Sequence, residues 1–435
     1  MTEKTITFVH CADLHLDSPF SGPGGLSPSM GAFLRKSTFR AFENAVDLAL
    51  ERGADFFIVS GDVYDGEDRS IRAQVFFLEQ LGRLSGAGIP SFVACGNHDP
   101  LSGWEADRDF PPLVRRFGPE VESFPLEKDG VIVGQIHGYS YPVRDVTENI
   151  ALRFAGRKGE GFNIAVLHCN VGGRKGHENY APCSLDDLRA ASMDYWALGH
   201  VHAAGVLCPR PFIAYPGCTQ GRNIREQGKK GAYFVTLGAA EGGLPAGANA
   251  EFVPCDSVRW RAEELSVSFM ERDEEFFQAV SAIREKARKD GGGLPVLLRL
   301  TLSGRGGVHG LVGRPGFLKG PGGLLDTLNE GEEDRPDFVF LEEIVDETAP
   351  ALDLDGLASG SHLVGDFLKE VAAFREKGRL REGLEAIMKE MGVLDKIPAP
   401  EVLDLIASLT EEDVGRLLDR GVYAALSGLL EGGGR

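Results

Sequence analysis

The chain has 435 residues, of which 43% are hydrophobic and 26% charged, a composition typical of a globular protein with a large core. This length exceeds one ordinary domain, so we expect two or three. No apolar run reaches the roughly 18 residues of a membrane-spanning helix, and no basic segment followed by an apolar stretch marks a secretory signal. The seven cysteines form no CxxC pair, which is typical of reduced thiols. We therefore expect a cytoplasmic protein.

The net charge of −19 argues at first against a nucleic-acid partner. However, residues 331–435 hold 24 acidic and 11 basic side chains, a balance of −13, which leaves −6 for the first 330 residues. Because the acidity is concentrated in the C-terminal part, the N-terminal part can still bind phosphates.

Short apolar segments alternate with amphipathic ones along the first 240 residues. The apolar segments predict strands at 5–10, 55–61, 89–95, 131–140, 162–168, 194–200, 212–217 and 231–237. Between them, apolar residues at helical spacing predict helices at 31–52 and 70–85, and Ser184 is a suitable N-cap for a third helix at 184–191. This alternation indicates an α/β architecture whose first strands are largely parallel.

The composition changes beyond about residue 245. The Gly/Ala-rich segment 237–252 predicts a loop or a domain boundary. A small β-α-β module is indicated by residues 259–268, a helix near 272–289 and a strand at 295–304, whereas the Gly-rich segment 304–336 is uninformative. From residue 361 onward three or four amphipathic helical segments follow.

Five of the predicted strands run into polar residues at their C-terminal ends. In chain order these tips are Asp13-Leu14-His15, Gly61-Asp62, Asn97-His98-Asp99, His168 and His200-Val201-His202. Because ligands of open α/β sheets bind at the carboxyl ends of the strands, we expect the tips to converge. Nitrogen and oxygen donors without a thiolate suit a binuclear site for divalent metals. Asp62 is the natural bridge, since among the central candidates only a carboxylate can hold two cations and offset their charge.

Each motif has an ordinary explanation when it stands alone. A Gly-Asp or Gly-Asn pair after a strand is usually a turn, and an HxH pair usually lies on an exposed strand. The five tips together, each at a strand end, favour a metal site. A structural role is favoured for the isolated His10 and His137, whereas for His177 substrate contact and a solvated loop stay equally open.

Basic residues gather in the segment 221–231, with sequence GRNIREQGKKG. The side chains that could contact phosphates are Arg222, Arg225, Lys229 and Lys230, and a solvated hairpin is the alternative. Because these side chains follow the last of the five tips and could contact phosphates, we favour substrate binding by Arg222, Arg225 and Lys229, with His177 as a further candidate.

The five tips resemble the signature segments of the calcineurin-like metallophosphoesterases. Within that family the sequence resembles the bacterial DNA repair exonucleases of the SbcD/YhaO type in the segments HCADLHLDSPF, SGDVYD, GHENYAPCSLDDL and YPGCTQGRNIREQGKKGAYFV. The resemblance covers about residues 1–240. It implies two divalent ions, expected to be Mn²⁺, with one bound by Asp13, His15, Asp62 and His202 and the other by Asp62, Asn97, His168 and His200.

The implied reaction is hydrolysis of a phosphodiester. Two ions roughly 3.5–4 Å apart lower the pKa of a bridging water, which attacks phosphorus opposite the leaving sugar oxygen. His98 is expected to stabilise the developing charge or protonate the leaving oxygen, with Asp99 holding its tautomer. Asp65 departs from the wider family, in which archaeal and eukaryotic members often carry histidine. This difference leaves the implied metal ligands unchanged, whereas the details of the implied exonuclease activity stay open.

The resemblance also implies an α/β fold, a metallophosphoesterase β-sandwich flanked by helices in the order α/β/β/α. It divides the chain into a catalytic domain at 1–245, a small α+β capping domain at 246–345 and a C-terminal helical partner-docking region at 346–435. The implied partners are DNA and an SMC/Rad50-like coiled-coil ATPase of the YhaN/SbcC type, with a homodimer left open and no membrane contact. Besides a DNA nuclease, a small-molecule phosphodiesterase and a DNA-end-binding scaffold with a minor catalytic role remain as alternatives.

Overall fold

The computed structural model describes most of the chain up to residue 376. The described residues are 5–376 apart from 23–27, 67–69, 105–107, 174–177, 239–246, 269, 271, 320–321, 352–353 and 361–362, and then 409–410, 413–415, 418, 422 and 426. The chain divides into two compact units, Met1–Ala262 with Glu285–Arg299 and Asn329–Glu343, and Glu263–Arg284 with Leu300–Leu328 and Ile344–Arg435. Within the described ranges no helix has the length and apolar character needed to cross a membrane.

Two six-stranded sheets form most of the first unit. The first sheet has the order β12-β11-β1-β2-β3-β4, in which β1 to β4 are parallel while β11 and β12 are antiparallel to their neighbours. Its strands are β1 (Thr5–Cys11), β2 (Phe56–Ser60), β3 (Ser91–Ala94), β4 (Val114–Arg116), β11 (Gly231–Gly238) and β12 (Ala248–Pro254). Parallel pairing brings the carboxyl ends of β1, β2 and β3 to one edge.

The second sheet has the order β5-β6-β7-β8-β10-β9. The central strands β6, β7, β8 and β10 are parallel, and β5 and β9 pair antiparallel at the two edges. Its strands are β5 (Glu122–Lys128), β6 (Val131–Gly138), β7 (Phe162–His168), β8 (Tyr195–Gly199), β9 (Gly205–Pro209) and β10 (Phe212–Tyr215).

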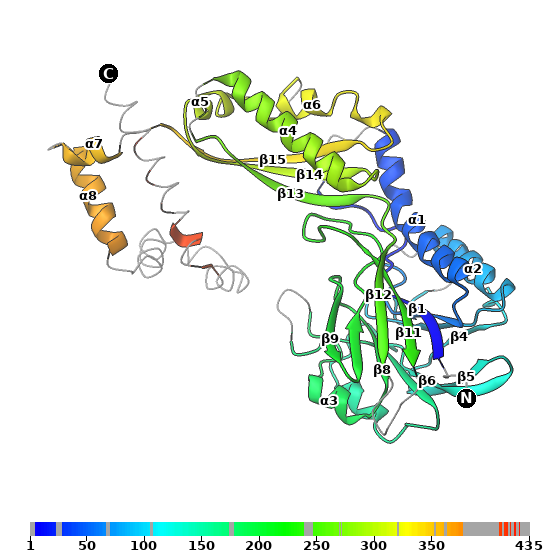
Figure 1. Cartoon of the computed structure of the whole chain (residues 1–435). Helices are drawn as coiled ribbons and strands as arrows, with labels where there is room; N and C mark the ends of the chain where they lie inside the picture. The colour runs from blue at the N-terminus through cyan, green and yellow to red at the C-terminus, as the bar shows by residue number, and fades with distance from the viewer. Residues whose placement is uncertain are drawn as a thin grey trace. The chain divides into compact units, whose positions relative to one another are not determined.

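Three apolar layers hold the sheets and helices together. Phe8 of β1 and Val166 of β7 belong to the layer between the sheets, whereas the next residue along β1, Val9, packs toward α1 (Pro28–Arg52) and α2 (Ile71–Gly86). These two helices lie side by side (Figure 1). On the second sheet the outer layer contains residues of the 3₁₀ helix η2 (Ile150–Phe154) and of α3 (Leu185–Ala190). Each fully buried large apolar side chain contributes roughly 1.5–3 kcal/mol. The predicted sandwich of two sheets flanked by helices is confirmed.

A three-stranded sheet with the order β13-β14-β15 follows later in the chain. The elements after β12 are β13 (Arg259–Ser266), α4 (Asp273–Gly291), β14 (Val296–Arg305), α5 (Val308–Val312), α6 (Leu324–Asn329), the 3₁₀ helix η3 (Glu332–Asp334), β15 (Val339–Ala349), α7 (Leu354–Ser359) and α8 (Leu363–Glu376). The predicted strand, helix and strand of the small module therefore form near their expected positions.

One sequence-based expectation is wrong in part. The segment 237–252 was expected to be a loop or a domain boundary, but β12 begins at Ala248 and pairs with Leu237 of β11. As a partly exposed edge strand, β12 does not need the apolar run that marks a buried strand. The Gly-rich segment 304–336, for which the sequence was uninformative, contains the helices α5 and α6, and buried Val308 and Leu324 supply their apolar contacts.

The expected domain limits at 245 and 345 stay predictions. Most of the proposed docking region, 346–435, lies outside the described residues, which include α7, α8 and a few positions near the end. Among these, Leu368 forms a small apolar cluster with Val422 and Leu426.

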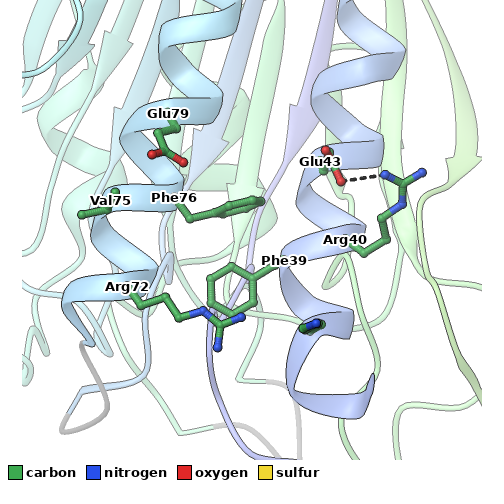
Figure 2. Close-up of a pocket in the computed structure, with 8 residues that line it drawn as sticks. Phe39, Arg40, Glu43, Arg72, Val75, Phe76 and Glu79 are labelled. Atoms are coloured by element: carbon green, nitrogen blue, oxygen red, sulfur yellow. Dashed lines mark hydrogen bonds and ion pairs between the residues drawn. The ribbon is translucent and has the colours of Figure 1, made fainter. Parts of the chain in front are cut away.

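A groove of about 540 Å³ opens between α1 and α2 (Figure 2). Phe39 and Phe76 point toward each other across it, edge to face, with ring centroids 4.9 Å apart. Arg72 lies 4.7 Å above the Phe39 ring, and Arg40 pairs with Glu43. None of the predicted metal ligands lines this groove, so the candidate centre lies elsewhere.

Candidate metal centre

The candidate centre lies where β1, β2, β3, β7 and β8 end. Main-chain hydrogen bonds tie the first two tips together, because the Asp13 N–H donates to Gly61 O (3.1 Å) and the His15 N–H donates to Asp62 O (3.1 Å). The His200 N–H in turn donates to the Asp13 carboxylate (3.1 Å). The parallel strands therefore bring tips that lie far apart in the sequence to one edge, as expected.

The backbone at this edge is strained. Outside glycine, a positive φ is uncommon. Four predicted ligands adopt it, namely Asp13 (51°), His15 (43°), Asp62 (52°) and His200 (103°). Such conformations cost of order 1–3 kcal/mol each and persist where the surrounding structure enforces them, most often at functional sites. All four residues follow shortly after β1, β2 or β8, where the chain leaves the strand and the candidate centre lies.

Two glycines allow the close packing of these tips. Gly61 has φ of 92°, and a Cβ there would collide with the His168 ring. A Cβ on Gly96 would collide with the Asp62 carboxylate. The glycine before Asp62 and the glycine before Asn97 are therefore spatial requirements as well as turn residues.

One group of donors comprises Asp13, Asp62 and His168, which are buried and could together hold a metal ion. The His168 Nε2 lies 3.4 Å from Asp62 Oδ2 and 3.0 Å from Asn97 Oδ1. An overlapping group comprises Asp13, His15 and His202. In this group the Nε2 atoms of His15 and His202 are 3.2 Å apart, and His15 Nε2 is 4.0 Å from Asp62 Oδ2.

The hydrogen bonds of these histidines fit a metal centre. His15 Nδ1 pairs with Asp65 (2.9 Å), His168 Nδ1 with Ser60 O (3.0 Å) and His202 Nδ1 with Glu226 (2.7 Å). Because all three partners are acceptors, each neutral ring carries its proton on Nδ1 and turns the Nε2 lone pair toward the centre. Metal-binding histidines typically make this second hydrogen bond. Two lone pairs 3.2 Å apart, on His15 and His202, repel each other unless they share a cation.

In the metal-free centre, burial and neighbouring charges set the pKa values of the predicted ligands. Burial disfavours a protonated His168, but the charge and hydrogen bond of Asp62 and the charge of Asp13 outweigh burial and raise its pKa to about 9. Burial disfavours ionised Asp62, yet the charge and hydrogen bond of His168 hold its pKa well below the usual range. Burial lowers the pKa of His15 to about 4, with a contribution from Arg222. In the metal-free protein a proton on His168 therefore offsets part of the negative charge of the two carboxylates, and a bound divalent ion can replace it in doing so.

His200 sits beside this centre. Its ring lies edge-on to the His168 ring with centroids 5.3 Å apart, and its Nε2 lies 2.8 Å from Glu178 O. The donor groups that the described residues form do not include His200. Its expected role as a ligand, like those of the other predicted ligands, stays a prediction.

The expectation that Asp99 holds the tautomer of His98 is wrong. The Asp99 carboxylate accepts hydrogen bonds from the backbone N–H groups of Gly96 (2.6 Å) and Val63 (2.8 Å), which fix the strand tips. The His98 Nδ1 instead lies 2.9 Å from Asp65 Oδ1. Burial opposes the charged form of His98, but the hydrogen bond to Asp65 and the charges of Asp62 and Asp65 raise its pKa. Asp65 is therefore the residue that orients His98.

The remaining candidates divide between structural and surface positions. His10 is buried and contacts Tyr195 Oη (3.0 Å), while His137 contacts Ser123 Oγ (2.7 Å), in agreement with structural roles. The predicted phosphate contacts Arg225 and Lys229 are exposed, and Arg222 donates to Asp65 at 2.5 Å. Lys230, by contrast, is buried and donates to His202 O (3.2 Å), and His177 lies outside the described residues.

Two residues of the centre were not assigned a role from the sequence. Asp65 contacts His15, His98, Arg222 and Ser18, and Glu226 contacts His202. The only signal for them is general, namely that each ligand histidine needs an acceptor for its second nitrogen. Since every nearby carboxylate could serve, that signal does not select one.

Known proteins share this sequence pattern. Residues 6–204 match the calcineurin-like phosphoesterase family, and residues 260–349 match the middle domain of metallophosphoesterase YhaO. The chain is 36% identical over 360 residues to an uncharacterized metallophosphoesterase, YhaO, of Bacillus subtilis (strain 168), which covers 81% of this chain and 84% of the relative. It is 28% identical over 235 residues to the DNA double-strand break repair protein Mre11 of Aeropyrum pernix, covering 50% of this chain and 54% of that protein. An Mre11 of Sulfurisphaera tokodaii is 26% identical over 177 residues, covering 40% and 45% of the two chains.

The fold and these relatives together define a phosphoester hydrolase that uses divalent metals. The chain belongs to the calcineurin-like metallophosphoesterase family, with YhaO as a relative over most of its length. The family and the enzyme class predicted from the sequence are therefore confirmed.

We predict that Asp62→Asn weakens the binding of both metal ions, because the bridging position keeps its shape but loses its charge. Elemental analysis should find depleted metal, and hydrolysis of a phosphodiester should fall to background. Asp47→Asn, which removes a half-buried carboxylate paired with Arg83 away from the centre, is the matched control. Two fully occupied metals with intact hydrolysis in Asp62→Asn would exclude the bridging role.

A second prediction concerns Asp65→Asn. Since Asp65 raises the pKa of His98, the uncharged variant should lower that pKa, so His98 loses its proton at a lower pH. If His98 acts as an acid, the alkaline limb of the rate profile should move to lower pH, which measurements of kcat against pH will reveal. An alkaline limb at the same pH in both proteins would show that Asp65 does not tune His98.

Proposed function

We propose that this protein is a DNA nuclease that hydrolyses phosphodiesters with two bound divalent ions, taken to be Mn²⁺, in the cytoplasm and in the service of DNA repair. The observation that carries the proposal is the set of three histidines whose Nδ1 atoms are held by Asp65, Ser60 O and Glu226 while their Nε2 atoms face two buried carboxylates. The relatives named as DNA double-strand break repair proteins support DNA as the substrate.

The residues that would hold the ions are Asp13, His15, Asp62 and His202 on one side and Asp62, Asn97, His168 and His200 on the other. Bound there, the ions would supply a hydroxide at neutral pH and neutralise the phosphate oxygens. The protein's own contribution is to orient this donor set. Asp65, Glu226 and Ser60 fix the rings, and the backbone N–H of His98 donates to Asp62 Oδ1 (2.9 Å).

His98 is the candidate acid for the leaving sugar oxygen. Its side chain is 35% exposed, so a bound phosphodiester can reach it. Its raised pKa favours the protonated form, and Asp65 holds Nδ1 so that Nε2 can deliver a proton. The exposed Arg225 and Lys229 supply positive charge for the DNA backbone near the centre.

We also propose that the C-terminal region binds an SMC-like coiled-coil ATPase. The balance of −13 in residues 331–435 disfavours DNA as the partner of this region and favours a protein.

Digestion of labelled single- and double-stranded DNA with and without Mn²⁺ tests the proposed nuclease activity. Hydrolysis of small phosphodiesters without any cleavage of DNA would favour a small-molecule phosphodiesterase instead, and binding of DNA ends without cleavage would favour a scaffold.

We predict that His98→Ala keeps both metals and the fold but lowers the rate of DNA hydrolysis by roughly 10²–10⁴-fold, as expected for a lost general acid. The loss should be smaller with a nitrophenyl phosphodiester, because its leaving group scarcely needs a proton. Parallel kinetics on both substrates, with metal analysis, test this. Loss of metal from His98→Ala would show that His98 is a ligand.

A chain that ends near residue 350 should retain hydrolysis of a small phosphodiester, because every predicted ligand lies before residue 203. The same truncation should lose association with the ATPase. Circular dichroism, small-substrate turnover and a binding assay on the truncated protein check both parts. A folded, active truncation that still binds the ATPase would refute docking through this region, and an unfolded one would show that the region is needed for folding.

A further inference from the structure

The loop of residues 219–230, between β10 and β11, contacts the metal centre on one side. Glu226, 7% exposed, accepts a hydrogen bond from His202 Nδ1 through Oε1 (2.7 Å). Its other oxygen accepts from the Arg222 N–H (2.7 Å). One buried carboxylate therefore fixes a predicted ligand and the loop at the same time.

The same loop reaches a second part of the centre through Arg222. Its guanidinium donates to Asp65, whose other oxygen faces the Nδ1 atoms of His15 and His98, each at 2.9 Å. Among the described residues the buried Arg222 Nε has no hydrogen-bond partner, and the ion pair with Asp65 is the side-chain contact of Arg222 with the centre. The loop thus supports two predicted ligands, His15 and His202, and the candidate acid His98.

On its other side the loop is attached to the start of β13. The Trp260 indole N–H donates to Gly221 O (3.1 Å), and the Gly228 N–H donates to Trp260 O (3.1 Å). Trp260 is 1% exposed and stacks on Phe20 with ring centroids 6.3 Å apart. A Cβ on Gly221 would press on the Glu226 carbonyl and the Trp260 ring, so the loop passes between them only because this residue is glycine.

We propose that Glu226 is a positioning residue for the metal ligand His202, and that Trp260, by clamping Gly221 and Gly228, sets the loop conformation in which Glu226 does so. The geometry at the start of β13, where the match to the YhaO middle domain begins, then determines the affinity of one metal site. This inference rests on the divalent-metal centre of the proposed function, and it does not depend on DNA being the substrate.

Mn²⁺ binding to the full chain, measured by isothermal titration calorimetry without substrate, tests the proposal. Glu226→Gln retains one acceptor oxygen in place of two, so it cannot serve both His202 and the Arg222 N–H. We expect one of the two Mn²⁺ sites to weaken by roughly 10–100-fold, the range known for lost partners of ligand histidines, while the other is unchanged. Trp260→Phe keeps an aromatic ring but loses the N–H, and should weaken the same site by a smaller factor.

Glu251→Gln, which removes an exposed carboxylate paired with Arg52 on the same unit, is the matched control and should bind Mn²⁺ like the unmodified protein. Nitrogen NMR of the metal-free protein provides a readout that general destabilisation does not move. The His202 ring should carry its proton on Nδ1 in the unmodified protein and become a mixture of tautomers in Glu226→Gln.

The role of Glu226 would be refuted if each Mn²⁺ site had the same affinity in Glu226→Gln as in the unmodified protein. An unchanged His202 tautomer in this variant would refute it as well. Unchanged affinities in Trp260→Phe would overturn the clamp, and this variant carries the test if Glu226→Gln does not fold. A protein that binds two Mn²⁺ ions and responds to these variants but does not cut DNA would refute the proposed nuclease activity alone.

Discussion

The structure depends on keeping two carboxylates, Asp13 and Asp62, together in a place that water does not reach. Each is 1% exposed. Burying an ionised carboxylate is costly unless it is paired and hydrogen-bonded, and a second one nearby adds repulsion. The chain meets this cost with the charge of His168, with backbone N–H groups from His98 and His200, and with a donor set fit for divalent cations. A centre built this way has a strong preference for positive charge, which is the basis of its chemistry.

Holding these groups in place requires strain that the surrounding fold must offset. Four predicted ligands have positive φ, and glycines at 61 and 96 leave no room for a side chain. The apolar layers on both faces of the first sheet supply the opposing stability, since they fix the strands whose ends carry the strained residues. Core packing in this protein therefore serves to position the donors as well as to stabilise the fold.

Two further carboxylates, Asp65 and Glu226, hold the predicted ligand histidines in place. Asp65 contacts His15 and His98, and Glu226 contacts His202. Each sets which ring nitrogen carries the proton, so each determines whether a histidine can act as a ligand or as an acid. Both carboxylates also contact Arg222, so one loop is coupled to the ligand and acid positions.

The sequence by itself determined the α/β order and the residues that meet at the strand ends, whereas the two-sheet sandwich was implied by the family resemblance. Apolar strands and the polar tips that follow them are local features, and parallel order then brings the tips together. Only the tertiary structure decided which carboxylate serves which histidine. Asp99 follows His98 directly, yet its oxygens are taken by backbone N–H groups, and Asp65 reaches the ring instead. Glu226 lies 24 residues after His202 and Trp260 farther still. Such pairings depend on how loops from separate strands close over one another, and no local pattern of residues encodes that distance.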